Sequence, residues 1–162
     1  MALVLVGPMG AGKTTLGKKL AKKLGLTFAD TDRLIAAKHG TITKIFERFG
    51  EQHFRDLETE ALLTALSQFE VVATGGGIVL RPENLEAMSS HRVVFLDTNS
   101  EFVLGKINLD KRPLLKSDPQ AWDRIYSERI DLYKSVADVT IFTGNRPIRT
   151  LMKELEEFAL EN

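Results

Sequence analysis

One stretch near the amino terminus matches the phosphate-loop pattern G-x-x-x-x-G-K-S/T, with the sequence GPMGAGKT at residues 7–14. Its glycines let the backbone curl so that successive N–H groups point into one concavity, which suits an anion. In this interpretation Lys13 reaches the β- and γ-phosphates of a nucleoside triphosphate, and the Thr14 hydroxyl binds Mg²⁺. The alternative is a glycine-rich turn without a ligand. The predicted nucleotide contacts here are Gly10, Ala11, Gly12, Lys13, Thr14 and Thr15.

A pair of carboxylates, Asp30 and Asp32, follows a second apolar run. Their alternate spacing puts both side chains on one side of an extended segment. One carboxylate could hold Mg²⁺ through water, and the other could accept a proton from an attacking hydroxyl group. The alternative is that one of them only caps the helix that follows. The neighbouring phosphate loop favours the catalytic interpretation.

Three consecutive glycines, Gly75 to Gly77, follow a third apolar run. Glycines let a ligand approach the main chain closely and leave N–H donors open to it. A plain tight turn is the alternative. We favour a ligand contact because three consecutive glycines lose much conformational entropy on folding.

Three arginines are candidates for binding anions. Arg55 has Glu58 one helical turn away, placed to pair with it, and Arg129 lies in a later helix. Two such guanidinium groups could clamp a carboxylate or a phosphate by bidentate bonds, although each could equally be a solvated surface charge. Arg112 lies in a charged, proline-containing stretch at residues 109–120, which is typical of a mobile surface loop. An arginine on such a lid could neutralise charge during phosphoryl transfer.

The elements around these residues alternate between strands and helices. Residues 3–6 are predicted as a buried strand before the phosphate loop, and Leu16, Leu20 and Leu24 form one helical stripe after it. Near-continuous apolar strands between helices indicate a parallel sheet covered on both faces, whose ligands lie beyond the carboxyl ends of the strands. The other predicted strands are residues 26–29, 70–74, 92–96 and 139–142. The other predicted helices are residues 33–38, 42–49, 51–69, 82–89, 100–108, 121–134 and 147–160.

Length and composition fit one domain that spans residues 1–162. Lys and Arg together number 22, as do Asp and Glu, and this neutral balance argues against non-specific binding of nucleic acid or membrane surfaces. The absence of cysteine excludes disulfides, thiolate metal sites and a cysteine nucleophile, and it fits the cytoplasmic location that we expect. No stretch approaches the length of a membrane span. We expect a monomer that binds neither nucleic acid nor membranes.

Taken together, these motifs resemble the shikimate kinase family over almost the whole chain. The family's G-E-x-x-F-R segment is matched at residues 50–55, its glycine triplet at 74–77, its lid at 111–115 and its R-x-x-L-Y motif at 129–133. The phosphate loop and the D-x-D at residues 30–32 complete the set in the family's order. Each motif is weak alone, whereas the ordered set is highly specific.

The resemblance implies a fold and an activity. The fold is an α/β, three-layer P-loop kinase fold like that of nucleoside monophosphate kinases, with the five predicted strands in a parallel sheet of order 2-3-1-4-5. The implied activity is ATP-dependent phosphorylation of the 3-hydroxyl of shikimate in aromatic amino acid biosynthesis, with Mg²⁺ as cofactor. The acceptor-binding helices would span about residues 33–69 and the lid residues 109–120.

The same resemblance implies how shikimate would be bound. Asp32 would bind the ring hydroxyls and act as a base. Arg55 and Arg129 would hold the carboxylate, with the backbone of Gly76 and Gly77 beside the ring. The implied catalytic residues are Lys13, Asp32 and Arg112.

On the nucleotide side, the resemblance places Asp30 near Mg²⁺ together with Thr14, with Asp30 acting through water. Arg112 would close over ATP, and Arg146 falls in the segment that corresponds to the family's adenine loop. The chain departs from the family at the last strand, where members often carry an acidic residue and this chain has Phe142.

Other functions stay open from the residues alone. Another small-molecule kinase of the same fold, for gluconate or a nucleoside monophosphate, would use Arg55 and Arg129 for a different anion. A nucleotide switch is disfavoured because the chain lacks the N-K-x-D element with which GTPases read guanine. A binding-only domain is disfavoured because the chain retains Lys13, Thr14, Asp32 and Arg112.

Overall fold

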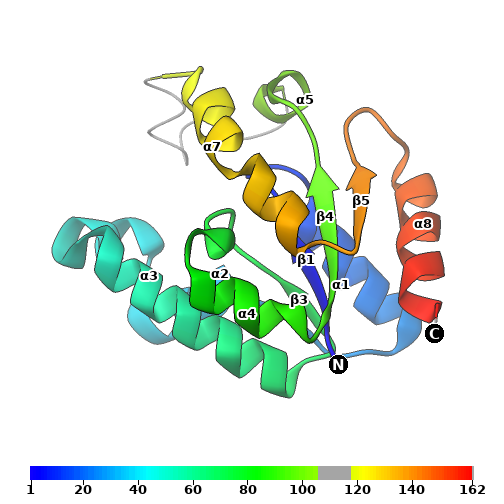
Figure 1. Cartoon of the computed structure of the whole chain (residues 1–162), viewed down its shortest axis with the longest axis horizontal. Helices are drawn as coiled ribbons and strands as arrows, with labels where there is room; N and C mark the ends of the chain where they lie inside the picture. Colours follow the sequence, from blue (N-terminus) through cyan, green and yellow to red (C-terminus); the bar gives the residue numbers. More distant parts are fainter. Residues whose placement is uncertain (106–117, 162) are drawn as a thin grey trace.

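The structure is a computed structural model that describes residues 1–105 and 118–161. Arg112 and most of the predicted lid lie outside the described residues, as do residues 106–108 of the helix predicted at 100–108. The described part forms three layers, in which a central sheet carries helices on both faces (Figure 1).

Five parallel strands form the sheet in the order β2-β3-β1-β4-β5, which confirms the implied topology. β1 lies at the centre, paired with β3 on one side and with β4 on the other. β2 is shorter than predicted and includes Asp30, because its three residues pair with the three residues of β3. The strands are β1 (Leu3–Val6), β2 (Phe28–Asp30), β3 (Val71–Ala73), β4 (Arg92–Asp97) and β5 (Val139–Phe142).

The helices follow the predicted segments closely. They are α1 (Lys13–Leu24), α2 (Thr31–His39), α3 (Ile42–Gln68), α4 (Pro82–Ser89), α5 (Ser100–Leu104), α7 (Ala121–Val136) and α8 (Ile148–Leu160), with a 3-10 turn η1 (Ile78–Leu80). α1 ends at Gly25, whose left-handed φ of 69° lets its N–H bond to the carbonyl of Ala21. α3 is interrupted at Gly50, where φ is 82°, so its halves match two predicted helices. Among the described helices, none is both long enough and apolar enough to cross a membrane.

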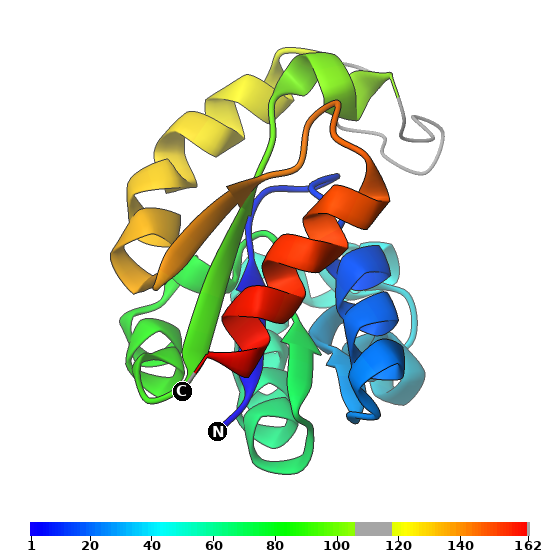
Figure 2. The same cartoon turned by 90° about the vertical axis from the view of Figure 1, so that its right-hand side faces the viewer.

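Alternate residues of the strands pack against two separate helical layers. Leu3 and Leu5 of β1 belong to the core beneath α1 and α8, which lie side by side on one face (Figure 2). Val4 and Val6 belong to the core on the other face, which α4, α7 and the second half of α3 cover. Since all four residues of β1 are buried, the strand is a continuous apolar run.

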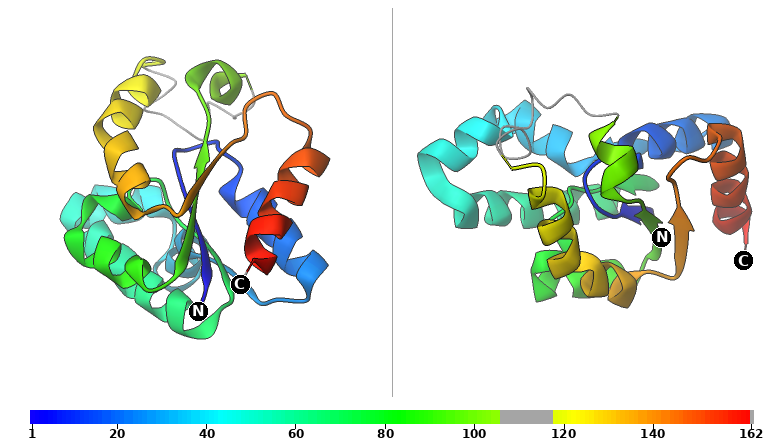
Figure 3. Two further views of the ribbon diagram at one scale, coloured as in Figure 1. Left: turned by 45° about the vertical axis from the view of Figure 1, so that its right-hand side comes forward. Right: turned by 90° about the horizontal axis from the view of Figure 1, so that it is seen from above.

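α2 and the part of α3 around Gly50 extend away from the sheet on the side of β2 (Figure 3, right). They enclose a small apolar core of their own, formed by Ile35, Ile45, Phe54 and Leu57. Packing of Phe54 in this core fixes the rotation of α3 about its axis. That rotation determines where the next residue, Arg55, lies.

His91 lies directly before β4, at the opposite edge of the sheet from the carboxyl ends of the strands. Its Nδ1 accepts a hydrogen bond of 3.0 Å from the N–H of Ala2. Burial, and then the positive charge of the amino terminus, lower the pKa of His91 below its ordinary value of 6.5. Protonation would remove the acceptor and break this bond.

We expect the free energy of unfolding to decrease as the pH falls below about 6.5, because the unfolded chain then binds a proton that folded His91 takes up only at lower pH. His91→Gln should lose this contribution and show a shallower decrease. Urea unfolding followed at a series of pH values between about 7 and 5 measures both slopes. Parallel curves for the two proteins would rule out the role given to His91.

Candidate active site

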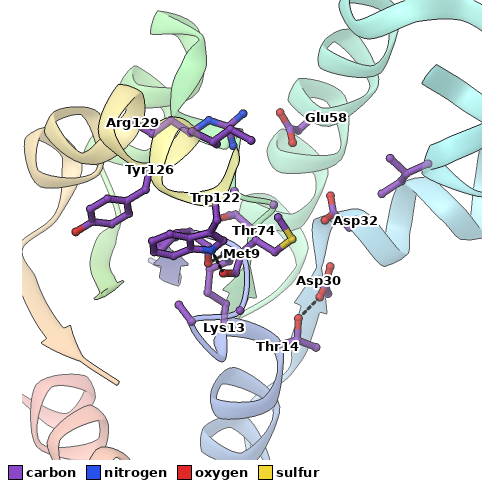
Figure 4. A pocket seen from close by; sticks show the side chains of 18 of the residues that line it. Met9, Lys13, Thr14, Asp30, Asp32, Glu58, Thr74, Trp122, Tyr126 and Arg129 are labelled. Atoms are coloured by element: carbon purple, nitrogen blue, oxygen red, sulfur yellow. Dashed lines mark hydrogen bonds between the residues drawn. The ribbon is translucent and has the colours of Figure 1, made fainter. Parts of the chain in front are cut away.

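A cavity of about 620 Å³ opens at the carboxyl ends of the strands, the edge at which open α/β sheets bind ligands (Figure 4). The phosphate loop, the residues after β2 and the glycines after β3 line it, together with parts of α3 and α7. Most of the predicted site residues therefore lie around one space. They are Gly10, Ala11, Gly12, Lys13, Thr14, Thr15, Asp30, Asp32, Arg55, Gly76, Gly77 and Arg129.

The phosphate loop has the curled backbone that its glycines allow. Gly7 has a φ of 146°, and a Cβ there would lie 2.2 Å from the carbonyl oxygen of Leu96, so only glycine fits. Gly12, with a φ of 93°, precedes α1, and no side chain caps the first turn of that helix. The N–H groups at this helix end are therefore available to an anion.

The nearly buried ammonium group of Lys13 lies over this loop. It donates hydrogen bonds to the carbonyl oxygens of Gly7 and Pro8, the latter at 2.9 Å. A cation held beside the N–H groups of the loop adds to their attraction for phosphate oxygens. This arrangement supports the phosphate-loop interpretation over a turn without a ligand.

Asp30 caps α2, as the alternative interpretation predicted, and also contacts Thr14 of the phosphate loop. One carboxylate oxygen accepts a hydrogen bond of 3.2 Å from the N–H of Arg33 and so caps α2. The other accepts a hydrogen bond from the Thr14 hydroxyl (Figure 4). A hydroxyl and a carboxylate are the hard oxygen donors that Mg²⁺ prefers, so these residues fit that ion. In the described ranges no three His, Asp or Glu side chains gather to hold a metal, and Mg²⁺ usually completes its shell with water and phosphates.

Asp32 lies in the first turn of α2 and lines the cavity opposite α7 (Figure 4). Its Oδ1 lies 2.7 Å from the position that a Cβ on Gly75 would occupy, so a side chain there would displace this carboxylate. The N–H of Gly75 donates to the Thr31 hydroxyl at 3.3 Å. The segment after β2 and the glycine triplet are thus fitted to each other.

Arg55 and Glu58 form the buried ion pair that their spacing predicted. Nη1 of Arg55 lies 2.9 Å from Oε1 of Glu58, and the two residues are 9% and 1% exposed. Burial raises the pKa of Glu58, and the charges of Arg55, Arg129 and Arg81 oppose this shift. Nε of Arg55 is also buried and, in the part of the chain that the structure describes, makes no hydrogen bond. Arg55 is therefore not the solvated surface charge of the alternative interpretation.

Arg129 projects from α7 into the same cavity and is half-buried (Figure 4). A Cβ on Gly76 would lie 3.5 Å from its Nη1, whereas a Cβ on Gly77 would lie 2.2 Å from Nη1 of Arg55. The glycines thus contact both guanidinium groups, and Gly77 has no room for a side chain. Two arginines that are far apart in the sequence therefore lie beside the same glycine triplet.

Sequence reasoning missed the aromatic residues of the cavity wall. Trp122 and Tyr126 line the cavity from α7, with ring centroids 5.0 Å apart and planes at 12°. Burial raises the pKa of the Tyr126 hydroxyl, and its hydrogen bond to Asp97 raises it further. Trp122, Tyr126, Arg129 and Tyr133 share one helical face, so the spacing around Arg129 was the signal that could have identified them.

Among the described residues, one predicted nucleotide contact, Arg146, does not line the cavity. Arg112 lies outside the described residues. The guanidinium group of Arg146 bonds to both carboxylate oxygens of Glu154 and to the carbonyl of Phe142, at 3.0 Å. Its hydrogen bonding lowers the pKa of Glu154. The roles of both arginines stay predictions.

Comparison with known proteins identifies the family. The sequence profile described as shikimate kinase matches residues 9–159. The shikimate kinase of Francisella tularensis subsp. novicida is 39% identical over 166 residues, which cover 98% of this chain and 94% of that protein.

Solved structures agree with this match. A shikimate kinase from Acinetobacter baumannii in complex with shikimate has a TM-score of 0.91 and 40% identity, covering 98% of this chain and 92% of its own. The shikimate kinase from Aquifex aeolicus has a TM-score of 0.84 and 33% identity, covering 98% of this chain and 95% of its own. With its phosphate loop, paired arginines and parallel sheet, the chain belongs to the shikimate kinase family.

Proposed function

We propose that this chain transfers the γ-phosphoryl group of ATP to the 3-hydroxyl group of shikimate, which gives shikimate 3-phosphate and ADP. The family supports this proposal, as does the Acinetobacter baumannii relative solved with shikimate. The observation that carries it is the single cavity in which a phosphate loop faces two arginines and a carboxylate. The reaction would be a step of aromatic amino acid (chorismate) biosynthesis.

In this proposal the phosphate loop and the first turn of α1 bind the triphosphate through their N–H groups, and Lys13 pairs with the β- and γ-phosphates. Mg²⁺, when bound, would neutralise charge that develops on the phosphate oxygens. Thr14 would bind the ion directly and Asp30 through water. Arg112 is proposed to close over the nucleotide, and Arg146 to contact its base.

Shikimate is a small polyol acid, so its binding requires a clamp for the carboxylate and an acceptor for a hydroxyl proton. Arg55 and Arg129 supply forked donors for the carboxylate. Asp32 orients the 3-hydroxyl and accepts its proton as the oxygen attacks the γ-phosphorus and the bond to the bridging oxygen of ADP breaks. Phosphoryl transfer depends mainly on such positioning and on charge stabilisation.

We also propose that the protein acts as a monomer in the cytoplasm and binds neither nucleic acid nor membranes. The neutral charge balance of the chain supports the last two statements.

A comparison of acceptors tests the function. The purified chain is mixed with Mg²⁺-ATP and with shikimate, gluconate or a nucleoside monophosphate, and ADP release is followed. We expect ADP release well above background with shikimate as the acceptor, and background release with gluconate or a nucleoside monophosphate. ADP release with gluconate or a nucleotide, and none with shikimate, would overturn the proposed substrate and favour another kinase of this fold.

Asp32→Asn should nearly abolish turnover while ATP still binds, because the amide keeps the shape of the side chain but is no base. Its matched control is Asp30→Asn, two residues away, which should instead raise the Mg²⁺ concentration needed for half-maximal activity. Steady-state rates and a nucleotide titration measure both effects. Near-normal turnover of Asp32→Asn would refute the role of base.

Arg55→Ala should weaken shikimate binding by about 2–5 kcal/mol, as for other truncated charge pairs. Arg55→Lys is the control, since it retains a charge beside Glu58 but loses the fork that matches a carboxylate. It should fold normally and still bind shikimate less tightly. Calorimetric titration gives both affinities, and unchanged binding in the Ala variant would remove Arg55 from the clamp.

A further inference from the structure

Besides Lys13, three side chains of the described residues donate hydrogen bonds to carbonyl oxygens in the loops of the cavity. Nε1 of Trp122 donates to Met9 at 2.9 Å, and the Tyr133 hydroxyl donates to Gly76 at 2.6 Å. The Thr143 hydroxyl, at the end of β5, donates to Ala11 at 2.8 Å. Each of these carbonyls belongs to a loop rather than to a helix or strand, so no regular backbone bond orients it.

The orientation of a carbonyl determines that of the next N–H. A trans peptide is planar, so its C=O and N–H bonds point in opposite directions. The bond from Trp122 holds the Met9 carbonyl toward α7, so the N–H of Gly10 points away from that helix. In the same way, the bond from Tyr133 to the Gly76 carbonyl makes the N–H of Gly77 point away from α7. In the described ranges, neither N–H donates to a protein acceptor.

These peptides need an external restraint. In each of these two peptides the residue that carries the N–H is a glycine, and glycine has the widest choice of backbone conformations. Gly10 has a φ of 85°, and Gly77 lies at the end of three consecutive glycines. Without the bonds to Trp122 and Tyr133, both peptide planes could rotate, and both N–H groups would lose their direction.

α7 is well suited to supply the restraint. Trp122 stacks on Tyr126, whose hydroxyl donates to Asp97 at 2.8 Å. Tyr133 is fully buried and stacks on Phe95 of β4, with centroids 5.1 Å apart. The two donors are thus anchored to the sheet through one helix, and the spacing of residues 122, 129 and 133 puts Arg129 on the same helical face.

We propose that Trp122 and Tyr133 are positioning residues that orient the Met9–Gly10 peptide for the nucleotide and the Gly76–Gly77 peptide for the acceptor. The inference rests on the proposed function, because it assigns the first peptide to ATP and the second to shikimate. Burial raises the pKa of the Tyr133 hydroxyl, and the positive charge of Arg129 opposes that rise, which places Arg129 near the donor of the acceptor half. One helix therefore aligns the two substrates with each other.

The test is a pair of conservative variants that serve as controls for each other. Trp122→Phe keeps a stacked ring and Tyr133→Phe keeps the whole ring, so each removes mainly one donor. We expect Trp122→Phe to raise the KM for ATP about three- to tenfold with little change in the KM for shikimate, and Tyr133→Phe to do the reverse. Steady-state kinetics with each substrate varied in turn measures the four constants, and thermal melting measures folding.

The crossed pattern distinguishes positioning from general support of the fold. Variants that only melt at lower temperature, or that change both KM values equally, would overturn the inference. If Trp122→Phe does not fold, Thr143→Val tests the nucleotide half from another element and should likewise raise the KM for ATP. An unmodified protein without shikimate-dependent ADP release would refute the proposed function instead, and nucleotide titration of Trp122→Phe would then still decide the nucleotide half.

Discussion

Parallel pairing on both sides of β1 is the constraint on which the site depends. Because β1, β2 and β3 run in one direction, the phosphate loop, the Asp30 segment and the glycine triplet all leave the sheet at one edge. The register between β1 and β3 also aligns the loops that follow these two strands. Leu5 is paired with Ala73, and Gly7 and Gly75 each follow two residues later, so the two glycine-rich loops begin at the same level.

Much of the fold could be predicted because its signals are local. Apolar runs identified the strands, and the break at Gly50 needed only a residue that tolerates a φ of 82°. The order of the strands came from the resemblance to a family, because pairing of β1 with β3 and β4 joins segments about 70 to 90 residues apart, which no local pattern specifies. The same limit applies to the site. The motifs identified candidate residues in the sequence, but they did not give the distances between their side chains.

The donor roles of Trp122 and Tyr133 were missed for one physical reason, although Tyr133 ends the R-x-x-L-Y motif. Both side chains act through carbonyls that lie 113 and 57 residues away, and any residue type can offer a carbonyl. Nothing in the sequence near Met9 or Gly76 indicates which donor approaches. Asp30 shows the opposite case, because the capping interpretation was visible in the sequence and the structure confirms it. The second carboxylate oxygen accepts from Thr14, and the role toward Mg²⁺ stays a prediction.

Charge balance explains why two arginines would serve one acceptor carboxylate. Glu58 is fully buried against Arg55 and also feels the charge of Arg129, so it already neutralises one of the two guanidinium groups. Glu51 pairs with Arg55 as well, with 3.4 Å between its Oε1 and Nη2 of the arginine, and it lines the cavity. Since the carboxylates of its own helix offset the charge of Arg55, much of the positive charge for an acceptor carboxylate would come from Arg129. The same carboxylates weaken the repulsion between the two guanidinium groups, which is strong in a partly dehydrated space.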